Sequence, residues 1–329
     1  MKTLYIDCFS GISGDMFIGA LLDAGGDSEH LVKELKKLKI SEEYELKWKK
    51  IVKNGITSTK FDVEVKNAHK HTHHHEHSHD HDDHDNGHSH HHEHGHTHDH
   101  EHGHTHGHHH SHGEHGHTHD HTHHHSHGEH VHTHDHNLQH SHGEHEHTHG
   151  NNHQHGHHHH EHRTYQSIKE MIETAGFKEE VKDLSLRIFK KIAEAEGHIH
   201  GLPIEKVHFH EVGAVDSIID IIGTAILLDQ LRISRVKSSA IVAGSGKIRI
   251  DHGIYPVPAP ATLEMLKGIP IQQTDIKAEL TTPTGAAIVA VLAEEFCPFP
   301  SINIESIGYG AGTKTFPDRP NVLRVVIGE

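Results

Sequence analysis

The chain has 329 residues, of which 54 are histidine, and its formal net charge at pH 7 is −17. Residues 69–162 hold 48 of these histidines together with 15 acidic residues and one basic residue, and so carry −14 of that charge. The other 235 residues are close to neutral, which argues against a nucleic-acid surface. With no basic leader and no apolar run of ~18 residues, we expect a cytoplasmic protein without membrane or nucleic-acid partners.

The chain begins with a pattern typical of a buried strand, a glycine-rich loop and a helix. Residues 3–9 are β-branched, aromatic or apolar apart from Asp7, and the apolar helix from Met16 should end at Gly25 and Gly26. This connection directs backbone N–H groups at an anion, although residues 10–15 match neither a P-loop nor GxGxxG. An ordinary tight connection is the favoured alternative. Four loop residues are candidate phosphate ligands: Ser10, Gly11, Ser13 and Gly14.

Two aspartates flank this loop. Asp7 ends the strand and Asp15 opens the helix, so we expect two carboxylates at one rim. Such a rim suits a metal ion or a cationic ligand. An N-cap role would explain Asp15 without any ligand.

The first part of the domain, residues 1–66, should end in a β-hairpin. Residues 28–38 have the apolar spacing of a short helix. Residues 44–52 and 57–65 then alternate in polarity around Asn54-Gly55, which is the strongest short signal for a hairpin.

Residues 67–163 form a separate histidine-rich insertion. The segment has little apolar content and no amphipathic period, so we expect it to be disordered. Its HxH and HxxH spacings let neighbouring imidazoles share an ion such as Ni²⁺, Zn²⁺, Cu²⁺ or Co²⁺, which favours metal storage or delivery over a charge-buffering spacer. Representative candidate ligands are His73, His75, His104, His106, His157 and His159.

Residues 164–329 should complete the domain, and residues 207–230 are their most informative stretch. Two amphipathic helices are expected before it, over 165–175 and over 178–196, the second ending at Gly197. Within the stretch, a buried helix should carry two aspartates one turn apart on one face. Two histidines before it share a face if that segment is extended. The pattern predicts a divalent-metal or general-base cluster, and a capping aspartate with a solvated neighbour is the alternative. The cluster comprises His208, His210, Glu211, Asp216 and Asp220.

Strands and helices continue to alternate to the end of the chain. We expect a strand over 236–246, a helix over 259–266, a strand over 271–280, a helix over 281–296 and a closing pair of strands. The start of the helix at 281 offers hydroxyls and N–H groups to an anion, which makes Thr282, Thr284 and Gly285 candidate phosphate ligands. The fold class is therefore α/β or α+β, with a mixed sheet and flanking helices.

Five blocks of this sequence, in order, resemble a known family. They are YIDCFSGISGDMFIGALLDAG, HFHEVGAVDSIIDIIG, HGIYPVPAPATLEML, ELTTPTGAAI and GYGAGTKTFPDRPNVLRV. Together they are similar to the nickel-insertion proteins of the nickel-pincer cofactor pathway, the LarC family. A histidine-rich insertion between blocks of helices and strands is also typical of that family.

The resemblance implies a chemistry. A member would be a nickel chelatase, a metal-inserting lyase that places Ni²⁺ in pyridinium-3,5-bisthiocarboxylic acid mononucleotide, linked to CTP hydrolysis with Mg²⁺ or Mn²⁺. The product would go to an apo lactate racemase-type enzyme. We expect the family's further C-terminal domain, to which CTP binding is attributed, to be absent here and supplied by a separately encoded partner if one exists.

The resemblance also suggests roles for the candidate residues, and two other functions stay open. His208, His210, Glu211 or Asp216 would take part in catalysis, because a carbon–nickel bond requires a base for the ring proton. The expected metal ligands are Asp7, Asp15, His208, His210, Asp216 and Asp220, together with the tract histidines. The alternatives are a non-catalytic nickel store or metallochaperone, and a metal-dependent phosphohydrolase.

Overall fold

The computed structural model describes residues 1–66, 163–209, 214–250 and 252–329. Its main element is a seven-stranded mixed sheet in the order β2-β3-β10-β11-β1-β4-β9. The strands are β1 (Thr3–Asp7), β2 (Tyr44–Lys53), β3 (Ile56–Val65), β4 (Arg235–Ser238), β9 (Glu295–Phe296), β10 (Ile304–Ala311) and β11 (Val322–Gly328). The mixed sheet with flanking helices confirms the expected fold class.

Strand β1 lies inside the sheet because its residues are apolar on both faces. It pairs antiparallel with β11 and parallel with β4, and Leu4 and Ile6 are fully buried. The closing pair β10–β11 and the hairpin β2–β3 are both antiparallel, as predicted. Strand β3 then joins β10 in a parallel pair, which attaches the hairpin to the sheet.

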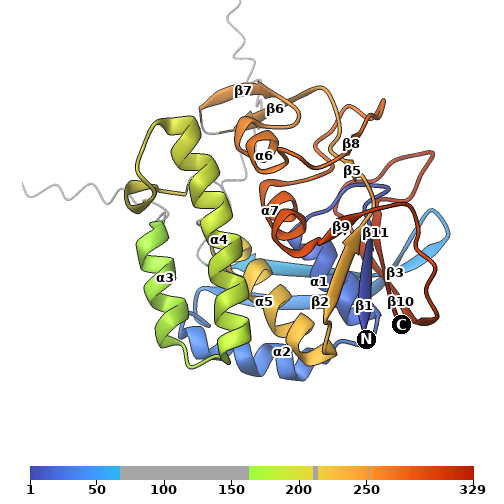
Figure 1. Cartoon of the computed structure of the whole chain (residues 1–329), viewed down its shortest axis with the longest axis horizontal. Coiled ribbons are helices and arrows are strands. Elements are labelled where there is room, and N and C mark those ends of the chain that lie inside the picture. Colours follow the sequence, from blue (N-terminus) through green and yellow to red (C-terminus); the bar gives the residue numbers. More distant parts are fainter. Residues whose placement is uncertain (67–162, 210–213, 251) are drawn as a thin grey trace, which may run out of the picture. The chain divides into compact units, whose positions relative to one another are not determined.

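The helices pack around α5 (Val215–Leu231), whose sequence is apolar on almost every side. It lies against α1 (Gly14–Asp23), α2 (Ser28–Leu35), α4 (Glu179–His200) and α7 (Pro283–Leu292). Helix α1 in turn packs on β3, β10 and β11, while α3 (Tyr165–Thr174) packs on α4 (Figure 1). A helix that is hydrophobic all round belongs in a core. Asp220 is the one carboxylate of α5 that is buried.

Several predicted boundaries are wrong. Helix α4 runs past Gly197 and ends at Gly201, which has the left-handed conformation of a C-cap (φ 65°). Gly197 lies inside the helix, and glycine is needed there because a Cβ would lie 2.8 Å from the Leu202 carbonyl oxygen. In the predicted 271–280 strand only β8 (Ile271–Gln272) is strand, paired with β5 (Ile241–Val242).

The remaining described elements are short. They are η1 (Lys36–Leu38), η2 (Ile204–Lys206), the antiparallel pair β6 (Lys247–Ile250) and β7 (Gly253–Pro256), and helix α6 (Pro260–Met265). No helix in the described ranges combines the length and the apolar character needed to cross a membrane.

Glu43 holds both ends of the histidine-rich segment. Its backbone carbonyl accepts a hydrogen bond from the Lys66 N–H at 2.8 Å. Its carboxylate accepts two bonds from the Arg163 guanidinium, each at 2.7 Å. The chain therefore leaves and re-enters the domain at one place. Residues 67–162, between these two ends, lie outside the described residues. They include all six representative tract histidines, and the expectation that the segment is disordered falls on them.

Candidate functional site

The predicted phosphate loop and the predicted phosphate-binding helix start lie side by side. The Thr282 N–H donates to the Ile12 carbonyl at 3.1 Å, and Ile12 forms a β-bridge with Thr281. Glycines allow this approach, because a Cβ on Gly11 would lie 2.1 Å from the Leu280 carbonyl oxygen. A Cβ on Gly285 would lie equally close to that of Ile12. Both glycines are therefore required for packing, whatever ligand they also serve.

The start of α7 is partly capped by its own side chains. The Thr282 hydroxyl accepts from the Gly285 N–H at 3.2 Å, and the Thr284 hydroxyl bonds to that of Ser217 at 3.4 Å. Ser10 is buried, and its hydroxyl has no hydrogen-bond partner among the described residues. A ligand at this helix start would meet Thr282 and Thr284 before it met Ser10.

A cavity of about 630 Å³, including its solvent-open part, joins the two phosphate candidates to the aspartates of α1 and α5. We call it the carboxylate pocket. Its lining residues are Ser13, Gly14, Asp15, Asp216, Ser217, Asp220, Glu279, Thr282, Pro283 and Thr284. Five of the predicted site residues around the glycine loop and in α5 thus line one cavity. These two parts of the chain are far apart in the sequence.

Asp220 is the deepest of these carboxylates. Its residue is 9% exposed, and its Oδ1 has no hydrogen-bond partner within the described chain. Gly14 packs directly on it, because a Cβ on Gly14 would lie 2.5 Å from Asp220 Oδ2. Burial, followed by the charges of Asp15 and Asp216, raises the pKa of Asp220 well above its usual range. Such a group is costly unless a proton or a cation neutralises it.

Asp15 is fixed by two donors. Its Oδ1 accepts from the Ser13 hydroxyl, and its Oδ2 lies 2.7 Å from Lys60 Nζ. Lys60 is 7% exposed and also contacts Asp62 at 2.7 Å. Burial lowers the pKa of Lys60, but Asp15 and Asp62 raise it on balance, so this lysine stays charged. The predicted N-cap role of Asp15 is wrong, because Ser13 occupies the N-cap.

Asp216 lies at the solvent-open mouth of the pocket. Its Oδ1 accepts from the Ser217 N–H at 2.8 Å. Surrounding protein removes part of its hydration and raises its pKa, and the charge of Asp15 raises it further. Ala214, not Asp216, is the N-cap of α5. Asp216 and Asp220 line one cavity, as their spacing in the sequence predicts.

A neighbouring cavity of about 500 Å³ adds a lysine to the site. It shares Ser13, Asp15, Glu279 and Thr282 with the carboxylate pocket. Its other lining residues are Met16, Leu280, Gly312, Thr313, Lys314 and Asn321. Lys314 Nζ donates to the Glu279 carbonyl at 2.9 Å. Lys314 was missed from the sequence, although it follows a glycine-rich turn in GAGTKT.

Other predicted ligands lie elsewhere. Asp7 pairs with Arg324, whose Nε lies 3.0 Å from its Oδ2, and does not line the carboxylate pocket. His208 is exposed and forms a β-bridge with Thr164. His210 and Glu211 lie outside the described residues. Within the described ranges, no group of three or more His, Cys, Asp or Glu side chains is arranged to hold a metal ion alone.

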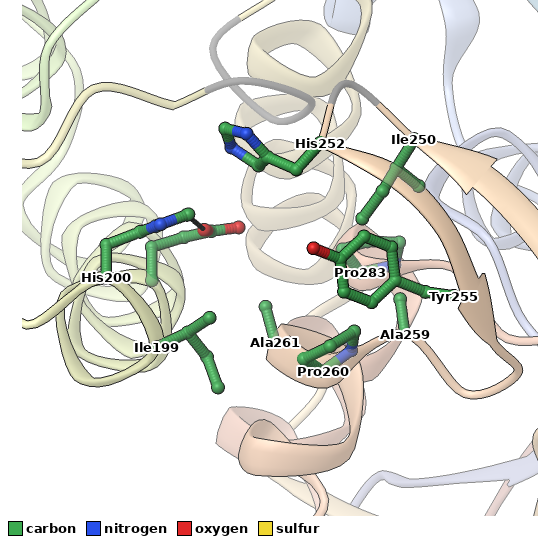
Figure 2. Close-up of a pocket in the computed structure, with 10 residues that line it drawn as sticks. Ile199, His200, Ile250, His252, Tyr255, Ala259, Pro260, Ala261 and Pro283 are labelled. Carbon is green, nitrogen blue, oxygen red and sulfur yellow. Dashed lines mark ion pairs between the residues drawn. The ribbon is translucent and has the colours of Figure 1, made fainter. Parts of the chain in front are cut away.

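A further cavity of about 500 Å³, again including its solvent-open part, was not predicted. We call it the histidine pocket. Glu196 and His200 reach it from the last turns of α4, His252 and Tyr255 reach it from the segment around β7, and Pro283 lines both this pocket and the carboxylate pocket (Figure 2). The prediction that α4 ends at Gly197 is the reason that this pocket was missed. Only a helix that continues to His200 places Glu196 and His200 on one face. The signal available in the sequence was Gly201, four residues later.

The comparisons with known proteins agree with one family. Residues 4–329 match the family described as "Nickel insertion protein". No solved structure matches. A pyridinium-3,5-bisthiocarboxylic acid mononucleotide nickel insertion protein of Geobacillus kaustophilus is 43% identical over 329 residues, which is all of this chain and 60% of that protein.

Two further relatives give the same result. A protein of the same name from Clostridium kluyveri is 39% identical over 331 residues, covering all of this chain and 62% of that relative. A putative nickel insertion protein from a Geobacter species is 36% identical, again over all of this chain and 62% of the relative. The chain spans about 60% of the length of the curated relatives it matches. On this match from residue 4 to residue 329, the chain belongs to the nickel insertion protein family.

Proposed function

We propose that this chain inserts Ni²⁺ into pyridinium-3,5-bisthiocarboxylic acid mononucleotide and so acts as a metal-inserting lyase. Relatives at 43% and 39% identity carry that name. The observation that supports it most is Asp220, a buried carboxylate at the base of a pocket that also holds Asp15 and Asp216. One of its oxygens has no hydrogen-bond donor among the described residues. An incoming cation would satisfy that oxygen.

Nickel is the substrate here, and the carboxylate pocket would receive it. Asp220 and Asp216 offer oxygen ligands, while the ion pair with Lys60 holds the Asp15 side chain in place. The described side chains do not complete a metal site on their own. The substrate's two thiocarboxylate sulfurs would supply the missing donors, and sulfur is a good ligand for late first-row metals. The pocket would therefore bind nickel and mononucleotide together more tightly than nickel alone.

The mononucleotide's phosphate requires a seat away from these carboxylates. The helix start at Thr282 and Thr284 and the ammonium of Lys314 lie on the side of the pocket shared with the neighbouring cavity. Hydroxyls, a helix N-terminus and a lysine are common phosphate ligands. We assign the phosphate to this side.

CTP-linked activity remains part of the proposal. The buried Oδ1 of Asp220, which has no donor in the described part of the chain, and the neighbouring carboxylates are hard oxygen ligands, which fit Mg²⁺ or Mn²⁺. Such an ion would neutralise triphosphate charge when bound.

The histidine-rich segment would bind and deliver nickel, and an apo lactate racemase-type enzyme would receive the finished cofactor. The 48 imidazoles of residues 69–162 favour nickel binding, and they also support the second candidate function, a non-catalytic nickel store. The two functions differ in what they require of α5, because a store has no use for Asp220.

The test compares two aspartates of one helix. Asp220→Asn removes the buried carboxylate of α5, whereas Asp229→Asn removes a surface carboxylate of the same helix that pairs with Lys178 at 2.7 Å. Each purified protein is mixed with the substrate, CTP, Mg²⁺ and saturating Ni²⁺, and the product is measured by activation of apo-racemase. We expect no detectable product with Asp220→Asn and normal product with Asp229→Asn. Full activity of Asp220→Asn would refute the assignment, and an inactive wild-type protein that still binds nickel would favour the store.

A further inference from the structure

The histidine pocket is built for a different ligand from the one in the carboxylate pocket. Most of its wall is apolar, and among the described residues no lysine or arginine lines it. The apolar residues are Ile199, Ile250, Ala259, Pro260, Ala261 and Pro283. Figure 2 shows the Tyr255 hydroxyl pointing into the space between α4 and the segment that leads to α6. An apolar cavity with a few polar groups suits a planar heteroaromatic ring and does not suit a phosphate.

The polar groups of this pocket include a carboxylate–imidazole pair. Glu196 Oε2 lies 3.2 Å from His200 Nε2, one helical turn away on α4. The His252 ring packs edge-on against the His200 ring, with 5.1 Å between ring centroids. Burial raises the pKa of Glu196, while its interactions with His200 and then with His252 lower it. A carboxylate on one imidazole nitrogen fixes the tautomer and makes the other nitrogen the proton acceptor.

We propose that the histidine pocket holds the pyridinium ring of the substrate, and that His200 is the base that accepts the ring proton during nickel insertion. Glu196 is its positioning residue. This inference rests on the proposed function and adds a residue and a ring site to it. It adds a candidate base to His208, His210 and Glu211, of which His208 lines neither pocket and the other two lie outside the described residues.

The step balances without an oxidant or a reductant. The C–H bond at the ring carbon between the two thiocarboxylate-bearing carbons breaks, and its electron pair forms the carbon–nickel bond. The proton goes to His200, and nickel remains Ni²⁺. Pro283 lines both pockets, so a ring in the histidine pocket lies next to the carboxylates that receive the metal.

The first measurement tests the ring site without any nickel chemistry. The probe is the dicarboxylate analogue of the substrate, in which oxygen replaces each thiocarboxylate sulfur. Ala261→Leu fills the pocket from α6, and Leu263→Phe adds bulk on an exposed part of the same helix as the control. We expect Ala261→Leu to raise the Kd of the analogue at least about tenfold, as added bulk in a fitted pocket does, and Leu263→Phe to leave it unchanged. An unchanged Kd in Ala261→Leu would overturn the ring site.

The second measurement tests the base. His200→Gln keeps a polar side chain but cannot accept the proton, and His198→Gln is the matched control in the same helical turn, outside the pocket. With substrate and nickel saturating, we expect His200→Gln to slow product formation about 100-fold or more, the usual contribution of a general base, with the analogue Kd within about threefold of wild type. Imidazole added to His200→Ala should restore part of the rate. Glu196→Gln should lower kcat without changing KM.

The outcomes separate the two proposals. Product formation by wild type together with an unimpaired His200→Gln rate would overturn the base and leave the proposed function intact. Failure of wild type to form product, with tight analogue binding that Ala261→Leu abolishes, would overturn the proposed function and the base and leave the ring site intact. Failure of wild type to bind the analogue would overturn the ring site itself.

Discussion

Asp7 and Asp220 are both largely buried carboxylates, and they differ in the groups that contact them. Asp7, at the end of β1, receives two guanidinium nitrogens from Arg324, which also stacks on Phe9 and Phe299. Asp220, in the middle of α5, receives no donor at Oδ1 from the described residues, and its carboxylate neighbours repel it. The first carboxylate stabilises the sheet. The second destabilises the empty fold and is the kind of group that a protein retains for a ligand.

The functional importance of the position of Asp220 is most easily tested at Gly14, whose missing side chain makes room for Asp220. In Gly14→Ala the new Cβ would lie 2.5 Å from Asp220 Oδ2 and would displace the carboxylate. A displacement of about 1 Å can lower a rate 100-fold, so we expect a loss of about that size in product formation at saturating nickel. Steady-state kinetics measures the loss, and thermal unfolding shows whether the fold is kept. Wild-type kinetics in this variant would show that the position of Asp220 is unimportant.

Removing the partner of Asp7 should have the opposite result. Arg324→Met keeps the aliphatic stem but leaves Asp7 without its cation. Because the arginine side chain is 37% exposed and water relieves part of the cost, we expect a loss of about 2 kcal/mol in unfolding free energy. Product formation at saturating nickel should stay near the wild-type value. Urea unfolding measures the first quantity, and a large loss of activity in the folded variant would contradict the structural role of Asp7.

Neutralising Asp220 should raise stability in the absence of metal. Its folded pKa is raised, so the folded state retains a proton that the unfolded state releases, and unfolding free energy falls as pH rises from about 4 to the folded pKa. In Asp220→Asn this fall of unfolding free energy with rising pH should be absent, because an asparagine does not titrate. With chelator present, the variant should exceed wild type by about 1 kcal/mol near pH 8 and by less near pH 4. A difference that is constant with pH would contradict the raised pKa.

Deleting residues 69–162 should have the smallest effect on the fold. With a short Gly/Ser linker between the two ends held at Glu43, unfolding free energy should change by less than about 1 kcal/mol. If the segment delivers nickel as we propose, product formation should fall only when nickel is limiting, because a higher local concentration of nickel matters only then. Aggregation of the deletion protein, or loss of activity at high nickel, would show that the segment does more.

The sequence predicts local features well and long-range ones poorly. The hairpin at Asn54-Gly55 and the closing strand pair are confirmed, because turn residues and alternation determine them locally. Asp216 and Asp220 share a cavity because helical spacing alone puts them on one face. Lys60 was missed, since its place in an alternating strand indicates an exposed side chain. Only the packing of α1 over β3 buries it against Asp15.

The Glu43 contact has a further consequence for how this protein can change. Because one residue anchors both Lys66 and Arg163, the distance between the two junctions is independent of what is inserted there. The entropy of closing a loop grows only with the logarithm of its length, by ~0.6 kcal/mol for each doubling. The number of residues inserted at this junction can therefore change at little cost in closure entropy. If the segment delivers nickel as we propose, an engineer could exchange it at the same junction for another metal-binding peptide.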